Sequence, residues 1–286
     1  MKKYFSLVLF AHSIFALPFA LIGFFLGVTT TEAPFQWHLL GLVLLCMVFA
    51  RNAAMAFNRY LDRNIDSKNP RTTMRDIPAG RVTANEALIF VIVNCILFVM
   101  TTAFINSLCL YLSPVALFVI LFYSYTKRFT ALCHLVLGLG LSLAPIGAYI
   151  AVTGHFSLVP VLYSFAVLFW VSGFDIIYAL QDEDFDRAEK LHSIPAALGI
   201  KNALLLSTVL HVCSALCVII PLHYIDFTWF YVAGVVFFCA MLIYQHLLVK
   251  PTDLSKVNRA FMTTNGYASV IFAVCFLADA FLRTHF

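Results

Sequence analysis

Two groups of acidic side chains, each at the end of a long apolar stretch, are the residues of this sequence best suited to chemistry. Acidic motif 1 is Asn58, Asp62 and Asp66, and acidic motif 2 is Asp182 and Asp186. Residues four apart share a face of an α-helix, so each motif would direct its oxygens to one side. Carboxylates at a membrane edge are costly and mark function. Because Mg²⁺ is bound through a few carboxylates plus substrate phosphates, the motifs predict a shared Mg²⁺ that holds a polyphosphate.

A structural interpretation competes with this one. The carboxylates of motif 1 could be solvated helix-end charges paired with Arg59 and Arg63. Three oxygen ligands on one face, matched by a second set, favour metal binding. Beside motif 2, Glu183 and Asp184 point to other faces and are expected to be solvated.

Two further charged residues lie deeper in the apolar stretches. Arg51 precedes Asn58 by seven residues, and Asp175 precedes Asp182 by seven, so each lies about two helical turns further in. A buried guanidinium must be paired. Arg51 therefore either pairs with Asp175 or grips the carboxylate of a substrate. Asp175 either binds substrate or forms a hydrogen bond between packed helices, and the sequence leaves these alternatives open.

Two basic segments complete the set. Tyr123 and Lys127 are four apart at the end of another apolar stretch and can offer a phenol and an ammonium to one anion. Arg71 and Arg75 are four apart in a loop that ends in a Pro-Ala-Gly turn, and they would clamp a diphosphate facing them. The alternative for all four is an ordinary interfacial tyrosine and cytoplasmic basic residues that set the topology.

The elements that must position these residues are membrane helices. Of the 286 residues, 62% are hydrophobic and 11% are charged, which excludes an ordinary soluble domain. The apolar runs are continuous rather than alternating, so they predict helices and not a barrel. Windows of about 20 residues give nine spans, near 5–28, 36–58, 85–106, 108–126, 130–153, 158–180, 202–223, 227–249 and 262–284.

Charge placement predicts the orientation. Of the 18 Lys and Arg residues, all except Arg51 and Arg283 lie in the N-terminal tail or in the loops after the even-numbered spans. By the positive-inside rule, the N-terminus and both acidic motifs are cytoplasmic. The net charge of +4 reflects this bias and gives no nucleic-acid signal. No transit peptide rich in Arg and Ser precedes the first span, which favours a multi-pass protein of the bacterial inner membrane.

The chain is predicted to be one all-α domain over residues 1–286, a polytopic bundle of nine transmembrane helices with two cytoplasmic Asp-rich motifs. The two longest cytoplasmic loops, about 59–84 and 181–201, carry the motifs at similar places in the two halves. This placement indicates a weak internal repeat.

Taken together, these residues resemble the UbiA superfamily of intramembrane aromatic prenyltransferases. That family has nine spans, an N-x-x-x-D-x-x-x-D motif after helix two and a D-x-x-x-D motif after helix six. It also has a Y-x-x-x-K motif, an R-T-x-x-R run and an Arg seven residues before the motif Asn. The matching positions here are Asn58/Asp62/Asp66, Asp182/Asp186, Tyr123/Lys127, Arg71/Arg75 and Arg51.

The resemblance implies transfer of a polyprenyl chain from its diphosphate to an aromatic carboxylic acid, with Mg²⁺ as cofactor. The acceptor would be 4-hydroxybenzoate or a dihydroxynaphthoate, on the routes to ubiquinone or menaquinone. The expected catalytic residues are Asp62, Asp66, Asp182, Asp186, Lys127 and Tyr123. Substrate would be bound by Arg51, Asn58, Arg71, Arg75 and Asp175, and the metal by both acidic motifs, including Asn58.

Two alternatives stay open at this point. One is another acceptor within the same superfamily, such as a haem or glycerol phosphate. The other is an ion-coupled transporter, because intramembrane Asp and Arg in an internal repeat also occur in carriers. Carriers place such sites near the membrane midplane, whereas the acids here gather at one face together with basic residues.

Overall fold

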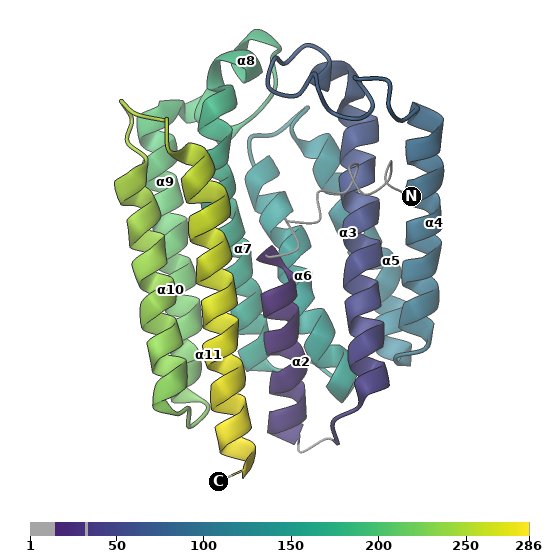
Figure 1. The fold of residues 1–286 in the computed structure, drawn as a ribbon, viewed down its shortest axis with the longest axis vertical. Coiled ribbons are helices and arrows are strands. Elements are labelled where there is room, and N and C mark those ends of the chain that lie inside the picture. The colour runs from purple at the N-terminus through teal and green to yellow at the C-terminus, as the bar shows by residue number, and fades with distance from the viewer. Residues whose placement is uncertain (1–14, 32–33, 286) are drawn as a thin grey trace.

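The computed structural model describes residues 15–31 and 34–285, with side chains to residue 283. This part of the chain is a bundle of roughly parallel helices without a named strand (Figure 1). Its elements are α2 (Leu17–Thr31), α3 (Trp37–Asp66), α4 (Ala84–Ala103), α5 (Ser107–Thr126), α6 (Cys133–Thr153), α7 (Leu158–Ala179), η2 (Leu180–Asp182), α8 (Glu183–Ala188), α9 (Ile194–Ile219), η3 (Ile220–His223), α10 (Trp229–Leu248), η4 (Arg259–Thr264) and α11 (Asn265–His285).

The predicted spans match these helices closely. Among the described residues, eight helical segments are long and apolar enough to cross a membrane, and they correspond to the second to ninth predicted spans. The first predicted span, 5–28, falls partly outside the described residues, and its remainder lies in the shorter apolar helix α2. The prediction of an all-α membrane bundle is therefore confirmed.

Local sequence signals set several helix ends. Thr83 and Glu86 form a capping box that begins α4, each side chain bonding the other residue's backbone N–H. The side chain of Ser193 caps α9 in the same role. Gly154 ends α6 with φ of 72°, a left-handed conformation that only glycine adopts without strain. These caps place the loops between spans where the charge pattern requires them.

The two acidic motifs are built differently. Helix α3 runs without interruption through the second span to Asp66, so motif 1 lies on one regular helix. Helix α7 ends at Ala179 and is followed by the single 3-10 turn η2 and the short helix α8. Asp182 ends η2, and Asp186 lies in α8. The i, i+4 spacing of motif 2 therefore does not lie on one regular helix.

Close helix contacts hold the middle of the bundle together. The indole of Trp170 on α7 is fully buried and donates to Asn265 Oδ1 at the start of α11, at 2.8 Å. Aromatic rings from α2, α10 and α11 surround it, including Phe19 and Phe238. At Gly138 on α6, a Cβ would lie only 2.4 Å from the Leu168 carbonyl oxygen of α7. The α6–α7 pair therefore packs backbone against backbone.

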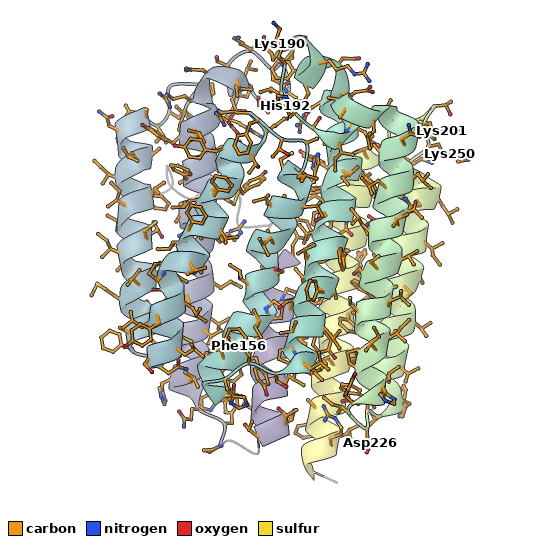
Figure 2. The ribbon with its side chains drawn as sticks, turned by 180° about the vertical axis from the view of Figure 1, so that it is seen from behind. Phe156, Lys190, His192, Lys201, Asp226 and Lys250 are labelled. Atoms are coloured by element: carbon orange, nitrogen blue, oxygen red, sulfur yellow. The ribbon has the colours of Figure 1, made fainter. Side chains whose placement is uncertain are left out.

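The ends of the bundle differ in charge. Lys190, Lys201 and Lys250 lie at one end, and Phe156 and Asp226 lie at the other (Figure 2). Helix α8 and the loop after α3 share the end that carries the lysines, whereas α11 ends at the opposite one (Figure 1). The basic loops predicted to lie on one side of the membrane thus lie together, at the end of the bundle that carries α8 (the α8 end).

Candidate functional site

Motif 1 is engaged in ion pairing at the α8 end. Asn58 Nδ2 donates to Asp62 Oδ2 at 2.9 Å, which confirms that residues four apart share a face of α3. The other Asp62 oxygen accepts from Arg128 Nη2 at 2.8 Å, and the same nitrogen donates to the Leu61 carbonyl at 3.0 Å. Arg128 thus attaches the segment after α5 to the end of α3.

Asp66 is more deeply buried, with 4% of its surface exposed. Its Oδ1 accepts from Arg75 Nη1 at 2.7 Å, and its backbone carbonyl accepts from Thr72 Oγ1 at 3.0 Å. Its Oδ2 is buried without a hydrogen-bond partner. One lone-pair-bearing oxygen of the motif is therefore available to a ligand.

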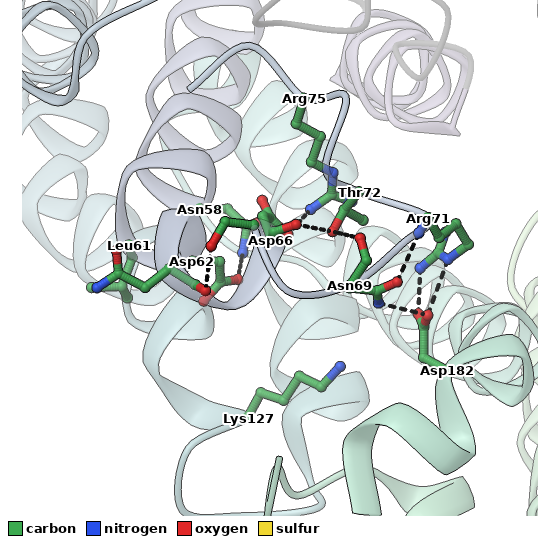
Figure 3. Close-up of polar contacts among 12 residues, drawn as sticks. Asn58, Leu61, Asp62, Asp66, Asn69, Arg71, Thr72, Arg75, Lys127 and Asp182 are labelled. Atoms are coloured by element: carbon green, nitrogen blue, oxygen red, sulfur yellow. Dashed lines mark hydrogen bonds and ion pairs between the residues drawn. The ribbon is translucent and has the colours of Figure 1, made fainter. Parts of the chain in front are cut away.

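Asp182 of motif 2 is held by the loop after α3, as Figure 3 shows. The Arg71 guanidinium binds both carboxylate oxygens, through Nε at 3.0 Å and through Nη2. Asn69 Nδ2 donates to the same carboxylate at 3.1 Å, and Arg71 Nη1 donates to the Tyr178 hydroxyl at 2.6 Å. Burial is the largest single effect and would lower the pKa of Arg71, but the hydrogen bonds and the charge attraction to Asp182, together with Tyr178, outweigh it and raise that pKa.

Asp186 has no exposed surface. Lys127 Nζ, just beyond the end of α5, lies 2.6 Å from Asp186 Oδ1. Neither Asp186 oxygen has a hydrogen bond of acceptable geometry. A buried carboxylate with only a poorly aligned cation has unused capacity to bind a ligand.

Each of the four motif aspartates is thus paired with a cation from another segment. The partners are Arg128, Arg75, Arg71 and Lys127, which bring together the ends of α3, α5 and α7. Within the described residues, no three His, Cys, Asp or Glu side chains converge as a metal site would need. The two motifs therefore lie at one end of the bundle with each aspartate neutralised by a cation.

A cavity of about 560 Å³ runs from this end into the bundle. Its polar lining includes Arg51, Asn58, Arg75, Tyr123 and Asp175. Five of the predicted site residues therefore face one space. The depth order expected from the seven-residue spacing holds on α3, which is one continuous helix, whereas Asp175 on α7 is separated from Asp182 by the 3-10 turn η2.

The rest of the cavity is mostly apolar and is formed mainly by α3, α5 and α6. It reaches the loop between α6 and α7 at Phe156, near the end opposite α8 (Figure 2). Two lining residues, Val115 and Phe156, are also more than half exposed, at 58% and 55%. The cavity is therefore open and not sealed, and its exposed apolar wall suits a hydrocarbon chain.

Aromatic rings cover one side of the polar end. Phe15, Phe174 and Phe261 lie with ring centroids 5.2–5.5 Å apart, and Tyr178 stacks on Phe261 at 4.1 Å. All four line the cavity together with Asp175. Such a cluster offers both faces and edges to a planar ring.

Asp175 has a partner that the sequence did not suggest. His134, in the first turn of α6, places Nδ1 2.7 Å from Asp175 Oδ2. A lone histidine at a helix start carries no spacing signal, so only the fold reveals this pair. Arg128 and Asn69 were missed for a related reason, because each acts on an aspartate more than 60 positions away.

Comparison with known proteins identifies the family. Residues 16–267 match the UbiA prenyltransferase family. A 4-hydroxybenzoate octaprenyltransferase of Tolumonas auensis is 30% identical over 229 residues, which cover 80% of this chain and 79% of that protein.

Two solved structures share the fold. The apo structure of a UbiA homolog from Aeropyrum pernix K1 has a TM-score of 0.84 and 33% identity, covering 94% of this chain and 98% of that one. A UbiA homolog from Archaeoglobus fulgidus bound to DMAPP and Mg²⁺ has a TM-score of 0.78 and 21% identity, covering 98% and 99%. The chain belongs to the UbiA prenyltransferase family, and it is a multi-pass membrane enzyme that transfers prenyl groups.

Proposed function

We propose that this enzyme transfers a polyprenyl chain from its diphosphate to a hydroxylated aromatic carboxylic acid, 4-hydroxybenzoate or a dihydroxynaphthoate, in ubiquinone or menaquinone biosynthesis. The observation that carries the proposal is a cavity with Asn58, Arg51 and Asp175 at its polar end and an otherwise mostly apolar lining. A substrate with an anionic head and a long hydrocarbon tail matches that lining. The 4-hydroxybenzoate octaprenyltransferase of Tolumonas auensis supports the choice of acceptor.

The diphosphate would bind at the α8 end, where the motif carboxylates supply the donor type that suits a divalent metal, although they do not converge while paired with cations. Asp66 Oδ2 and both oxygens of Asp186 are buried without hydrogen-bond partners, and oxygen is the donor that Mg²⁺ prefers. Asn58, Asp62, Asp66, Asp182 and Asp186 would hold it. When bound, Mg²⁺ supplies charge stabilisation to the leaving diphosphate. The Mg²⁺ and DMAPP of the Archaeoglobus fulgidus homolog support this assignment.

The cations of the site would bind the diphosphate itself. Arg71, Arg75 and Lys127 now neutralise motif aspartates at 2.6–3.0 Å. With a metal held by the aspartates, these side chains would be available to bind phosphate oxygens. Lys127, with Tyr123 four residues before it, would stabilise the charge that develops on the departing oxygen.

The acceptor would lie one layer deeper, between α3 and α7. Arg51 and Asp175 each lie seven residues, about 10 Å along a helix, below their motifs. The Arg51 guanidinium would bind the carboxylate of the acceptor, and the Asp175 carboxylate would accept a hydrogen bond from the acceptor's hydroxyl. The neighbouring aromatic rings would pack against the face of the acceptor ring. The allylic C–O bond then breaks, the diphosphate leaves with the electron pair, and a ring carbon forms the new C–C bond. The apolar lining of the cavity would keep water from the allylic carbocation.

The placement in the cell follows from charge. Lys190, Lys201 and Lys250 lie at one end of the bundle (Figure 2), the α8 end, where the motif aspartates also pair with their cations. This placement supports a cytoplasmic site in a bacterial inner membrane. A water-soluble aromatic acid would then enter from the cytoplasm, and the prenyl donor from the bilayer.

One experiment tests the function. The purified protein in lipid nanodiscs is given Mg²⁺, a polyprenyl diphosphate and, separately, 4-hydroxybenzoate, a dihydroxynaphthoate, glycerol phosphate or haem, and products are identified by mass. A prenylated aromatic acid is expected. Turnover of glycerol phosphate or haem alone would instead establish one of the other superfamily acceptors.

A further inference from the structure

The Asp175 carboxylate is in hydrogen-bond contact with the buried imidazole of His134. Asp175 lines the cavity, and its side chain is 18% exposed. Its Oδ2 lies 2.7 Å from His134 Nδ1. The His134 side chain is only 4% exposed and does not line the cavity. Any effect of His134 on a bound substrate must therefore pass through Asp175.

The surroundings of His134 fix which of its nitrogens carries the proton. The backbone N–H of Ile194, at the start of α9, points at Nε2 at 3.4 Å. A backbone amide only donates, so Nε2 is the acceptor. The proton of the neutral ring then lies on Nδ1 and is donated to Asp175. The imidazole thus binds one oxygen of Asp175, and the Asp175 side chain lines the cavity.

The imidazole has little freedom to move. Ser172 Oγ donates to the His134 backbone carbonyl at 3.1 Å, linking α6 to α7 three residues before Asp175. The neighbouring Cys133 thiol contacts the His192 carbonyl at 3.5 Å, which ties the same turn to the segment before α9. A rigid donor of this kind orients a carboxylate as well as stabilising its charge.

We propose that His134 is a positioning residue, which orients Asp175 to take the hydroxyl proton of the aromatic acceptor as its ring attacks the prenyl group. This inference rests on the proposed function. The acceptor O–H bond breaks and its proton moves to Asp175, while the ring carbon beside the hydroxyl forms a C–C bond to the allylic carbon. The proton on that ring carbon then leaves with the diphosphate, and Asp175 returns its own proton to the oxygen. One ring hydrogen has been exchanged for the prenyl group.

The test uses a double-mutant cycle in the full chain. His134→Leu removes both hydrogen bonds of the imidazole, Asp175→Asn removes the charge, and the double variant removes both. His134→Leu is expected to lower kcat about 10-fold or more, less than the 10²–10⁴-fold that a positioned base contributes, with the KM for polyprenyl diphosphate unchanged. In the Asp175→Asn background the same substitution should have little further effect, because the two residues act as one unit.

Two variants separate positioning from packing. His134→Asn retains a donor near the Nδ1 position but not the acceptor for Ile194, so it should recover most of the lost kcat. His211→Leu removes another buried imidazole, which bonds His246 at 2.8 Å and does not line the cavity. It should leave kcat near the wild-type value even if its melting temperature falls.

A series of acceptors supplies a readout that packing alone would not change. A fluorinated hydroxybenzoate ionises more readily and needs less help from a base, so the ratio of wild-type to His134→Leu kcat should be smaller with it. The proposal would be overturned if the ratio of wild-type to His134→Leu kcat were the same for both acceptors. It would also be overturned if His134→Leu lowered kcat equally with Asp175 and with Asn at position 175. If His134→Leu does not fold, the acceptor series is measured on the double variant and Asp175→Asn, which should then give matching ratios. A wild type that prenylates no aromatic acid would instead refute the proposed function.

Discussion

Arg75 Nη1 lies 2.7 Å from Asp66 Oδ1 and thereby folds the loop after α3 back onto the end of that helix. The pair joins a residue predicted to clamp phosphate to one predicted to bind metal. A substrate that brings both a metal and a diphosphate can satisfy both residues at once, so its binding requires the exchange of existing ion pairs and not the capture of isolated charges.

Turnover should depend strictly on a divalent metal. Asp62→Asn or Asp182→Asn should abolish activity without unfolding the bundle, because the amide keeps the shape but loses the charge. Activity is measured with and without EDTA, alongside a melting curve. Asp184→Asn, an exposed neighbour in α8, is the matched control and should stay active. Full activity in EDTA would eliminate the metal role.

Lys127→Ala should lower kcat more than it raises the acceptor KM. Its ammonium lies 2.6 Å from Asp186 Oδ1, at the end of the bundle where the diphosphate is proposed to bind. Loss of a group that stabilises developing charge costs about 10²–10³ in kcat. Steady-state kinetics with a varied acceptor give both constants, and the exposed Lys201→Ala serves as control. Normal kcat with a raised acceptor KM would move Lys127 to the acceptor side.

Arg51→Ala should discriminate between acceptors. If Arg51 binds the acceptor carboxylate, the loss with the natural acid is about 2–5 kcal/mol, because a buried charge is left unpaired. A neutral phenol without the carboxylate should react poorly with the wild type and change little in the variant. Kinetics of both acceptors on both proteins, with a melting curve, make the comparison. An equal loss for acid and phenol would point to a structural role.

Gly138→Ala should destabilise the bundle. The new methyl group would lie 2.4 Å from the Leu168 carbonyl oxygen and from Ser172 Oγ, so α6 and α7 must separate. Overpacking of this kind costs about 1–3 kcal/mol. Gly41→Ala in α3 has no neighbour within 4 Å and should leave the melting temperature unchanged or raise it. Equal melting temperatures for the two variants would contradict the close contact.

The sequence predicted the helices well because each span had to be apolar over its whole length. It predicted motif 1 for a second reason, since Asn58 and Asp62 lie on one uninterrupted helix and their spacing translates directly into contact. Motif 2 followed the same spacing, but the helix breaks at η2, and Asp182 and Asp186 take different partners.

The pairing between segments could not be predicted. Periodicity places a residue on a face of its own helix and says nothing about which distant residue lies opposite. Asn69 reaches Asp182 across 113 positions, and His134 reaches Asp175 across 41. The sequence offered Arg51 as a partner for Asp175, whereas the hydrogen bond to its Oδ2 comes from His134.

The exposure of Val115 and Phe156 in the cavity wall has a kinetic consequence. If the prenyl donor reaches the cavity through the bilayer, its effective concentration is its mole fraction in the lipid and not its concentration in the total volume. Added lipid should slow the reaction at constant total donor, whereas added buffer should not. For the water-soluble aromatic acid, added buffer should slow the reaction and added lipid should not. The rate at one active site therefore depends on the membrane concentration of one substrate and on the aqueous concentration of the other.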